Sequence, residues 1–264
     1  MSENGNVRGN ERKASTGLSM IAATLRRAAA FSLAEPELLG LDQLVGPGDT
    51  CFDIGAAYGM YSFALADLVG GNGSVHSFEP QRKPHGVLGA GRRLGGVGHL
   101  RPERAGMGRE PGTSHLRLPV RFGLPIHGHA HVGDSADERR RPTWWSHTRS
   151  LPTAIHSVDE IREQRSIERV HFMKVDVEGF EPNVVEGARD TIAEHRPALL
   201  LEIEDRHLSR YDTTAAEFTR SLREHGYTMY TWRRPRWVRT ERVLPETRNY
   251  LFATDQNWRH HRTA

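Results

Sequence analysis

Short apolar runs that alternate with helix-like segments are the strongest constraint on the fold of this chain. The run Thr50–Ile54 leads through a glycine-containing turn into a helical pattern over Met60–Val69, and Ser74–Phe78 is then the next predicted strand. Further along, Val170–Val177 and Ala198–Ile203 are again apolar runs with a helical segment between them. Strands that alternate with helices predict an α/β fold, in which a mostly parallel sheet has helices on both faces.

Other segments complete this pattern. Ser157 and Glu160 have the spacing of a capping box, in which each side chain satisfies a free amide at the start of a helix. Apolar residues at helical spacing predict one helix over Asn183–Arg196. Apolar runs at Tyr227–Trp232 and Asn249–Thr254 predict a closing antiparallel pair of strands.

The chain of 264 residues is long enough for one sizeable domain with small additions. Polar residues 1–17 predict a disordered tail, 18–45 predict N-terminal helices, and 46–256 are expected to form the main domain. Residues 257–264 are expected to be a second tail. Within the main domain, residues 107–150 are rich in Gly, Pro, His and Arg and predict a long excursion over one edge of the sheet.

Composition narrows the class of protein. The net charge of +3, from 36 basic and 33 acidic residues, is too balanced to indicate nucleic acid as a partner. Cys51 is the only cysteine, so no intramolecular disulfide is possible and the chain fits a reducing compartment. The sequence contains neither a signal-peptide core nor an apolar segment of membrane-spanning length. We therefore expect a cytoplasmic protein.

The stretch CFDIGAAYGMYS, residues 51–62, indicates a ligand-binding turn. Gly55 and Gly59 allow a sharp turn and a close approach of the backbone to a ligand, at the end of a strand and the start of a helix. Glu79 follows 20 residues after Gly59, at the end of the next predicted strand. An acid in this position accepts hydrogen bonds from both hydroxyls of a ribose. The ligand is therefore expected to contain a nucleoside, whereas the alternative is a tight turn without a ligand.

The charges near the turn discriminate between two nucleoside ligands. A dinucleotide site has the pattern G-x-G-x-x-G and no carboxylate near the pyrophosphate. This chain has only G-x-x-x-G, with Asp53 two residues before the first glycine. S-adenosylmethionine carries a positive sulfonium and a positive ammonium, which carboxylates attract. The charges therefore favour S-adenosylmethionine.

Five ordered blocks of the sequence together resemble the FkbM family of methyltransferases. The blocks are Phe52–Ser62, Phe78–Pro80, Ser157–Ile161, Lys174–Glu181 and Arg196–Ile203. The resemblance implies a Rossmann-like class I methyltransferase fold, with a mostly parallel seven-stranded sheet, helices on both faces and an antiparallel C-terminal strand pair. It also implies S-adenosyl-L-methionine as the cofactor and residues 46–256 as the methyltransferase domain. In one departure, Ala57 stands where the family usually has Asn.

The turn and the resemblance together predict the residues that bind the cofactor. Residues near Ala105–Gly108 are expected at the adenine. The predicted cofactor-binding set is Asp53, Gly55, Ala56, Ala57, Tyr58, Gly59, Ser62, Glu79, Pro80 and Asp176.

Three acids are candidates for catalysis. Asp176 and Glu178 flank Val177 and point to the same side if the chain is extended there. One of them could hold the acceptor or remove its proton, whereas Glu178 could instead cap the following helix. Glu202 ends the next strand and is expected either to line the pocket or to be a buried structural acid. Lys174, which belongs to the resemblance, is expected to pair with Asp176.

The segment His127-Gly128-His129-Ala130-His131 has three imidazoles that share one face if it forms a strand. The spacing matches no strong metal motif, so we expect no metal site and favour a solvated loop, with one His as a possible base.

The predicted function is transfer of a methyl group to a hydroxyl of a sugar, glycolipid or polyketide-like metabolite, where the preference for a hydroxyl comes from the resemblance. The expected partner is a small-molecule acceptor, with no nucleic acid and no membrane span. The alternatives are methylation of nitrogen, or of RNA through the Arg-rich run Arg233–Arg242. A nicotinamide-dependent oxidoreductase and a non-catalytic Rossmann-like protein are two further alternatives.

Overall fold

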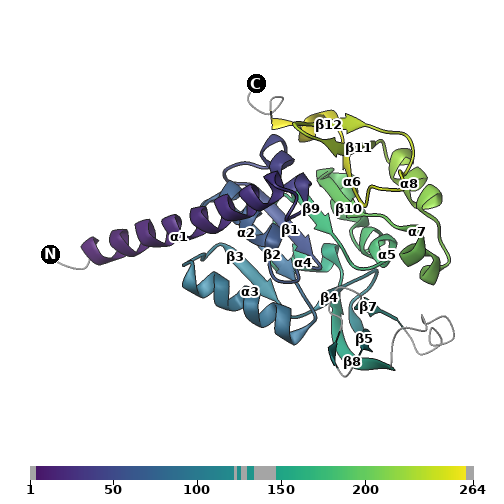
Figure 1. The fold of residues 1–264 in the computed structure, drawn as a ribbon, viewed down its shortest axis with the longest axis horizontal. Helices are drawn as coiled ribbons and strands as arrows, with labels where there is room; N and C mark the ends of the chain where they lie inside the picture. Colours follow the sequence, from purple (N-terminus) through teal and green to yellow (C-terminus); the bar gives the residue numbers. More distant parts are fainter. Residues whose placement is uncertain (1–3, 122–123, 126–129, 134–146, 260–264) are drawn as a thin grey trace.

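The computed structural model describes residues 4–121, 124–125, 130–133 and 147–259. Its main sheet has eight strands among these residues, in the order β12-β11-β13-β10-β9-β1-β2-β3 (Figure 1). The strands are β1 (Thr50–Ile54), β2 (Ser74–Phe78), β3 (Leu100–Glu103), β9 (Phe172–Val175), β10 (Ala198–Glu202), β11 (Thr228–Arg233), β12 (Arg236–Arg239) and β13 (Asn249–Ala253).

Strand pairing confirms the predicted α/β class. The neighbours among β3, β2, β1, β9 and β10 pair in parallel, and β13 pairs antiparallel with both β10 and β11. These seven strands correspond to the predicted seven-stranded sheet with an antiparallel C-terminal pair. The eighth strand, β12, extends the edge as the hairpin partner of β11, within the Arg-rich run Arg233–Arg242.

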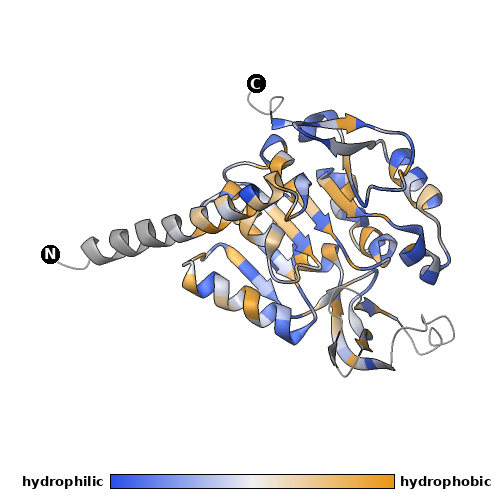
Figure 2. Cartoon of the chain, in the orientation of Figure 1, coloured by the Kyte–Doolittle hydropathy of each residue, from blue (hydrophilic) through white to orange (hydrophobic). Residues whose placement is uncertain are grey.

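Helices cover both faces of the sheet because buried side chains alternate along each strand. In β10, Leu200 packs with α2 (Met60–Val69) and the N-terminal elements, whereas Leu199 and Leu201 pack with helices of the opposite layer. That opposite layer comprises α4 (Val158–Gln164), α5 (Glu181–Glu186), α6 (Arg189–His195), α7 (Asp205–Leu208) and α8 (Ala215–Glu224). The strongly apolar strands in the middle of the molecule are visible in Figure 2. Helix α3 (Arg82–Leu94) and the short turns η4 (Ser209–Tyr211) and η5 (Asp255–Asn257) complete the main domain.

A second sheet stands where a loop-like excursion was predicted. It contains β4 (Gly106–Met107), β5 (Gly112–Arg121), β6 (Leu124–Pro125), β7 (His131–Val132) and β8 (His147–His156). Long antiparallel pairing between β5 and β8 holds it together. The prediction gave weight to Gly and Pro and overlooked the alternation Leu116, Leu118, Val120, whose side chains are buried. The small sheet projects from the carboxyl-terminal edge of the main sheet (Figure 1).

The N-terminal helix is longer than predicted. Helix α1 (Asn4–Ala30) begins inside the segment 1–17 that was assigned to a tail, because no proline interrupts the chain there. Its C-terminal half lies against α2, and the 3-10 helix η1 (Pro36–Gln43) follows it. At the other end, Asn257 is buried and Trp258 packs on Tyr230, so the body extends past the predicted boundary at residue 256.

Two local predictions are also corrected. The single helix over Asn183–Arg196 is divided into α5 and α6, because Gly187 packs against the backbone of Gly108. At Ser157 only half of the capping box forms: the Ser157 hydroxyl accepts the Glu160 amide, whereas the Glu160 carboxylate binds His156 instead. Within the described residues, no helix has the length and apolarity needed to cross a membrane.

Candidate active site

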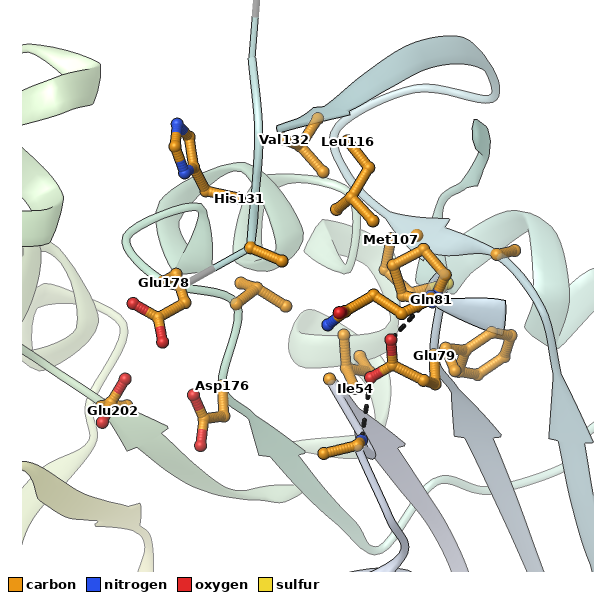
Figure 3. Close-up of a pocket in the computed structure, with 18 residues that line it drawn as sticks. Ile54, Glu79, Gln81, Met107, Leu116, His131, Val132, Asp176, Glu178 and Glu202 are labelled. Carbon is orange, nitrogen blue, oxygen red and sulfur yellow. Dashed lines mark hydrogen bonds between the residues drawn. The ribbon is translucent and has the colours of Figure 1, made fainter. Parts of the chain in front are cut away.

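The carboxyl ends of β1, β2, β9 and β10 meet at one edge of the main sheet, and a cavity of about 270 Å³ lies there. Its size is near the lower end of the range of small-molecule sites. The small sheet closes the cavity from above with Met107, Leu116 and Val132 (Figure 3). The described residues that line it are Ile54, Gly55, Ala57, Phe78, Glu79, Pro80, Gln81, Ala105, Gly106, Met107, Leu116, Ala130, His131, Val132, Asp176, Val177, Glu178 and Glu202.

The turn after β1 requires its first glycine. Gly55 has a φ of +81°, and a Cβ atom at this position would lie 1.8 Å from the Asp176 carbonyl oxygen at the end of β9. The amides of Gly55 and Ala56 both donate to the Phe78 carbonyl oxygen, at 3.0 Å each. The ends of three neighbouring strands are thus held together with no room for a side chain. As predicted, the backbone at this corner is exposed to the cavity.

Glu79 lies at the end of β2 with its carboxylate tied to the backbone. One oxygen accepts the Ala57 amide at 2.9 Å and the other accepts the Gln81 amide at 2.7 Å. Burial raises the pKa of Glu79 to about 7, although these two hydrogen bonds oppose the shift. A carboxylate has about four acceptor positions; the Gln81 side chain also hydrogen-bonds to this one, and the acceptor capacity that remains is available to a ligand. Figure 3 shows Glu79 and Gln81 at one end of the cavity.

Several predicted cofactor-binding residues do not line the cavity. Asp53 is 2% exposed and accepts the Ser62 hydroxyl at 2.5 Å, and Ser62 also contacts the Ser77 hydroxyl at 2.8 Å. Burial raises the pKa of Asp53 to about 6. These side chains brace β1 against α2 and β2 because Asp53 precedes the turn and points below the rim. The other predicted residues absent from the lining are Ala56, Tyr58 and Gly59.

Three carboxylates gather at the other end of the cavity. Figure 3 shows Asp176, Glu178 and Glu202 on the side opposite Glu79. Burial and the nearby Asp176 raise the pKa of Glu178 to about 8. The same two causes raise the pKa of Glu202 well above its ordinary range. All three predicted catalytic residues therefore share one site, in which the charge of Asp176 disfavours ionisation of the other two.

Glu178 reaches the cavity by a different backbone path than predicted. The chain is not extended after β9, because Glu178 has a φ of +58° in the left-handed region. Its carboxylate lies 3.2 Å from Nδ1 of the buried His207, and Arg210 donates to its carbonyl oxygen at 3.1 Å. These contacts offset a backbone strain on the order of 1–3 kcal/mol. The left-handed conformation and these contacts together place the carboxylate at the cavity.

Glu181, not Glu178, stabilises the start of the following helix. Its buried carboxylate accepts the amides of Val177 at 2.9 Å and Gly179 at 3.3 Å. Burial raises its pKa to about 7. Glu181 was predicted only as part of the Lys174–Glu181 block. Its position four residues after Val177 is the feature of the sequence that could have indicated this contact with the loop.

The part of the cavity lining that comes from the small sheet was not predicted from the sequence. Leu116, Val132 and Met107 come from the small sheet, as does His131, which is 5% exposed. The predicted adenine-contacting stretch contributes Ala105, Gly106 and Met107 to the lining. His127 and His129, the other members of the histidine segment, lie outside the described residues.

One group of side chains among the described residues has the spacing of metal ligands: Glu202, Glu204 and His207. Their ligand atoms lie within 4.8 Å of one another. Arginines already balance the charge of Glu204, since Arg206 lies 2.7 Å away and Arg248 lies 3.4 Å away. Glu204 is therefore held by ion pairs within the protein.

Among the described residues, the cavity lining contains four carboxyl groups and no lysine or arginine. Such a site attracts a cation and repels a phosphate. The model of the methyltransferase FkbM domain matches residues 53–229, about two thirds of the chain. The chain belongs to the FkbM methyltransferase family. It is a methyltransferase that uses S-adenosylmethionine, and the acidic lining and bare backbone at Gly55 fit that cationic donor.

The individual relatives have low sequence identity to this chain. The 31-O-demethyl-FK506 methyltransferase FkbM of Streptomyces tacrolimicus is 24% identical over 226 residues, which cover 74% of this chain and 78% of that protein. A solved FkbM methyltransferase from Methylobacillus flagellatus KT is 15% identical with a TM-score of 0.49. That match covers 90% of this chain, which spans only 58% of the other chain. Fibrillarin from Aeropyrum pernix, solved with S-adenosyl-L-methionine, is 13% identical with a TM-score of 0.45, covering 83% of this chain and 74% of its own.

Proposed function

We propose that this FkbM-family protein methylates a hydroxyl oxygen of a sugar, glycolipid or polyketide-like metabolite. The observation that carries the proposal is the gathering of Asp176, Glu178 and Glu202 at one end of the donor cavity. Carboxylates accept hydrogen bonds from hydroxyl groups, and a carboxylate with a raised pKa is a stronger base than a solvent-exposed one. The O-methylation named for the Streptomyces relative is consistent with this choice.

The two ends of the cavity have different roles in this proposal. Glu79 holds the ribose hydroxyls of the donor through its remaining acceptor positions, beside the backbone of Gly55 and Ala57 and next to Pro80. Asp176 lies where the turn after β1 meets β9 and faces the positive charges of the donor. Bound S-adenosylmethionine supplies a methyl carbon that is already activated by the positive sulfur.

The protein itself contributes acidic side chains and the alignment of the reacting atoms. The acceptor oxygen forms a bond to the methyl carbon, the carbon–sulfur bond breaks with its electron pair going to sulfur, and the hydroxyl proton goes to a carboxylate. We assign this role to Glu178 or Glu202 in its ionised form, which the positive charge of the donor favours; both line the cavity beside Asp176. Burial and the nearby Asp176 keep their basicity high, and alignment of the reacting atoms supplies several kcal/mol of rate enhancement.

We also propose a small molecule as the acceptor and the cytoplasm as its location. The arginines of the Arg233–Arg242 run lie on the edge hairpin β11–β12, whereas the cavity lies over the central strands. Cys51 is buried and is the only cysteine in the sequence, which suits a reducing compartment. We further propose that residues 46–256 supply the catalytic domain.

Calorimetric titration with S-adenosylhomocysteine, NAD and a short RNA tests the donor site. We expect micromolar binding of the first ligand alone and its loss in Glu79→Ala. The acceptor is then sought in extracts of cells that carry or lack the gene, as a metabolite heavier by one methylene group. A methylated RNA or amine as the product, with no methylated hydroxyl, would contradict the proposal.

A further inference from the structure

A chain of polar contacts leads from the N-terminal segment to the acidic end of the cavity. Glu35, just before η1, accepts the Tyr61 hydroxyl at 2.7 Å and the Asn249 side-chain amide at 2.8 Å through one carboxylate oxygen. The Asn249 side-chain oxygen accepts the Lys174 ammonium at 3.1 Å. Lys174 in turn lies 3.3 Å from a carboxylate oxygen of Asp176. Residues distant in sequence are thus connected from Glu35 to Asp176.

Charge fixes the direction of every contact in this chain. The Asn249 side chain has a carboxylate on one side and an ammonium on the other, so its NH₂ group faces Glu35 and its oxygen faces Lys174. Turning this amide over would set donor against donor and acceptor against acceptor. Asn249 therefore transmits the negative charge of Glu35 to Lys174 as an ordered dipole.

Lys174 depends on these partners because its side chain is 1% exposed. Burial alone lowers the pKa of its ammonium, but the surrounding carboxylates, Asp176 and Glu35 first among them, raise it above its usual range. The ammonium also lies 5.2 Å from the centre of the Tyr61 ring. A buried ammonium that loses one acceptor moves toward those that remain. Here the carboxylate in direct contact with the ammonium is that of Asp176.

We propose that Glu35 and Asn249 are positioning residues for the donor site. They hold the Lys174 ammonium between two carboxylates, so that Lys174 orients Asp176 without neutralising it fully. Asp176 then keeps negative charge available to the cavity. Glu35 and Asn249 both lie outside the residues 53–229 that the family model matches. The contacts that position Lys174 therefore come from segments that flank the matched domain. The inference rests on the proposed role of Asp176 toward the positively charged donor.

The relative affinities of S-adenosylmethionine and S-adenosylhomocysteine test this inference without an acceptor. The two ligands differ by the charged methylsulfonium, so their affinity ratio measures the negative charge that faces it. In Asp176→Asn we expect the preference for S-adenosylmethionine to fall. In Glu35→Gln and Asn249→Ala we expect a fall in the same direction, at least about threefold, because Lys174 shifts toward Asp176.

Asn249→Ala separates positioning from a simple loss of charge, because it removes no charged group. The matched control is Asp67→Asn, which removes one negative charge and the contacts that tie α1 to α2 through Ser19 and Arg26, away from this chain of contacts. Its affinity ratio should equal that of the wild type. Thermal unfolding of each variant identifies any loss of folding.

The outcomes separate this inference from the proposed function. If the wild-type protein binds neither ligand, the proposed donor site itself is wrong. If Asp176→Asn changes the ratio while folded Glu35→Gln and Asn249→Ala keep the wild-type ratio, Glu35 and Asn249 do not position Asp176. The inference is also overturned if Asp67→Asn changes the ratio as much as they do, since the effect is then general to the N-terminal segment.

Discussion

The main-chain amide of Ala57 donates a hydrogen bond of 2.9 Å to the carboxylate of Glu79. This contact joins the turn after β1 to the end of β2 before any ligand arrives. Two backbone amides anchor the carboxylate of Glu79 at the proposed ribose position, and the backbone at Ala57 takes the conformation that presents its amide. The two features of the sequence that indicated a nucleoside site therefore form one structural unit.

Replacing Glu79 by Gln should break this unit. Two backbone amides donate to the carboxylate, whereas a Gln side chain has one oxygen and an NH₂ group, so one amide would face a donor. We expect a loss of about 1–3 kcal/mol in the free energy of unfolding and at least tenfold weaker binding of S-adenosylhomocysteine. Denaturant unfolding and calorimetry measure the two effects. Glu103→Gln, at the end of the next strand and outside the cavity lining, is the control and should bind normally.

A second prediction follows from the backbone conformation of Ala57. Its φ of +45° lies in the left-handed region, which Gly and Asn adopt more easily than Ala. We expect Ala57→Gly and Ala57→Asn each to raise the free energy of unfolding by about 0.5–1 kcal/mol. Only Asn adds a polar group at the cavity, so only Ala57→Asn should also tighten donor binding. Ala56→Gly, at a neighbouring residue without a left-handed φ, should be destabilising, and equal stabilisation there would rule out the strain explanation.

Glu37 should make the protein less stable as the pH rises. Burial raises its pKa from 4.5 to about 7, and one carboxylate oxygen has no hydrogen-bond partner among the described residues. Because the folded state favours the protonated acid, the penalty is absent below pH 4.5 and complete above pH 7. At pH 8 we expect Glu37→Gln to be more stable than the wild type by on the order of 2–3 kcal/mol, with little difference near pH 4.5.

Urea unfolding at these two pH values measures the effect of Glu37. The exposed Glu241 provides the control, since Glu241→Gln should change stability equally little at both. A difference between Glu37→Gln and the wild type that does not depend on pH would show that Glu37 is not buried in its ionised form.

Binding of the donor should release protons. Glu178 has a pKa of about 8, and that of Glu202 is also raised, so both carry protons near pH 7.5 in the free protein. A sulfonium beside them favours the ionised carboxylates and lowers these pKa values. Calorimetry in buffers of different ionisation enthalpy should detect proton release with S-adenosylmethionine, and less with S-adenosylhomocysteine, which lacks the sulfonium charge. Glu202→Gln should reduce the difference; equal release by both ligands would place the sulfonium away from these acids.

Local patterns in the sequence determined the alternating elements of the main sheet and the position of its ligand edge. Apolar runs of strand length, helical spacing between them and the glycines around Gly55 depend on residues close together in the chain. The parallel direction of β1, β2, β9 and β10 follows from these patterns, and it brings Glu79, Asp176 and Glu202 to one edge. The family resemblance rested on the same local blocks.

Only the tertiary structure decided how the side chains are oriented at that edge and what covers it. Asp53 turns toward Ser62 because the pleat of β1 directs it below the rim, and β5 pairs with β8 across a segment whose composition resembles a loop. The contact of Glu35 with Asn249 spans almost the whole chain. Packing and hydrogen bonding between residues far apart in the chain leave no periodic pattern in the sequence. These interactions place the charged side chains at the proposed donor site.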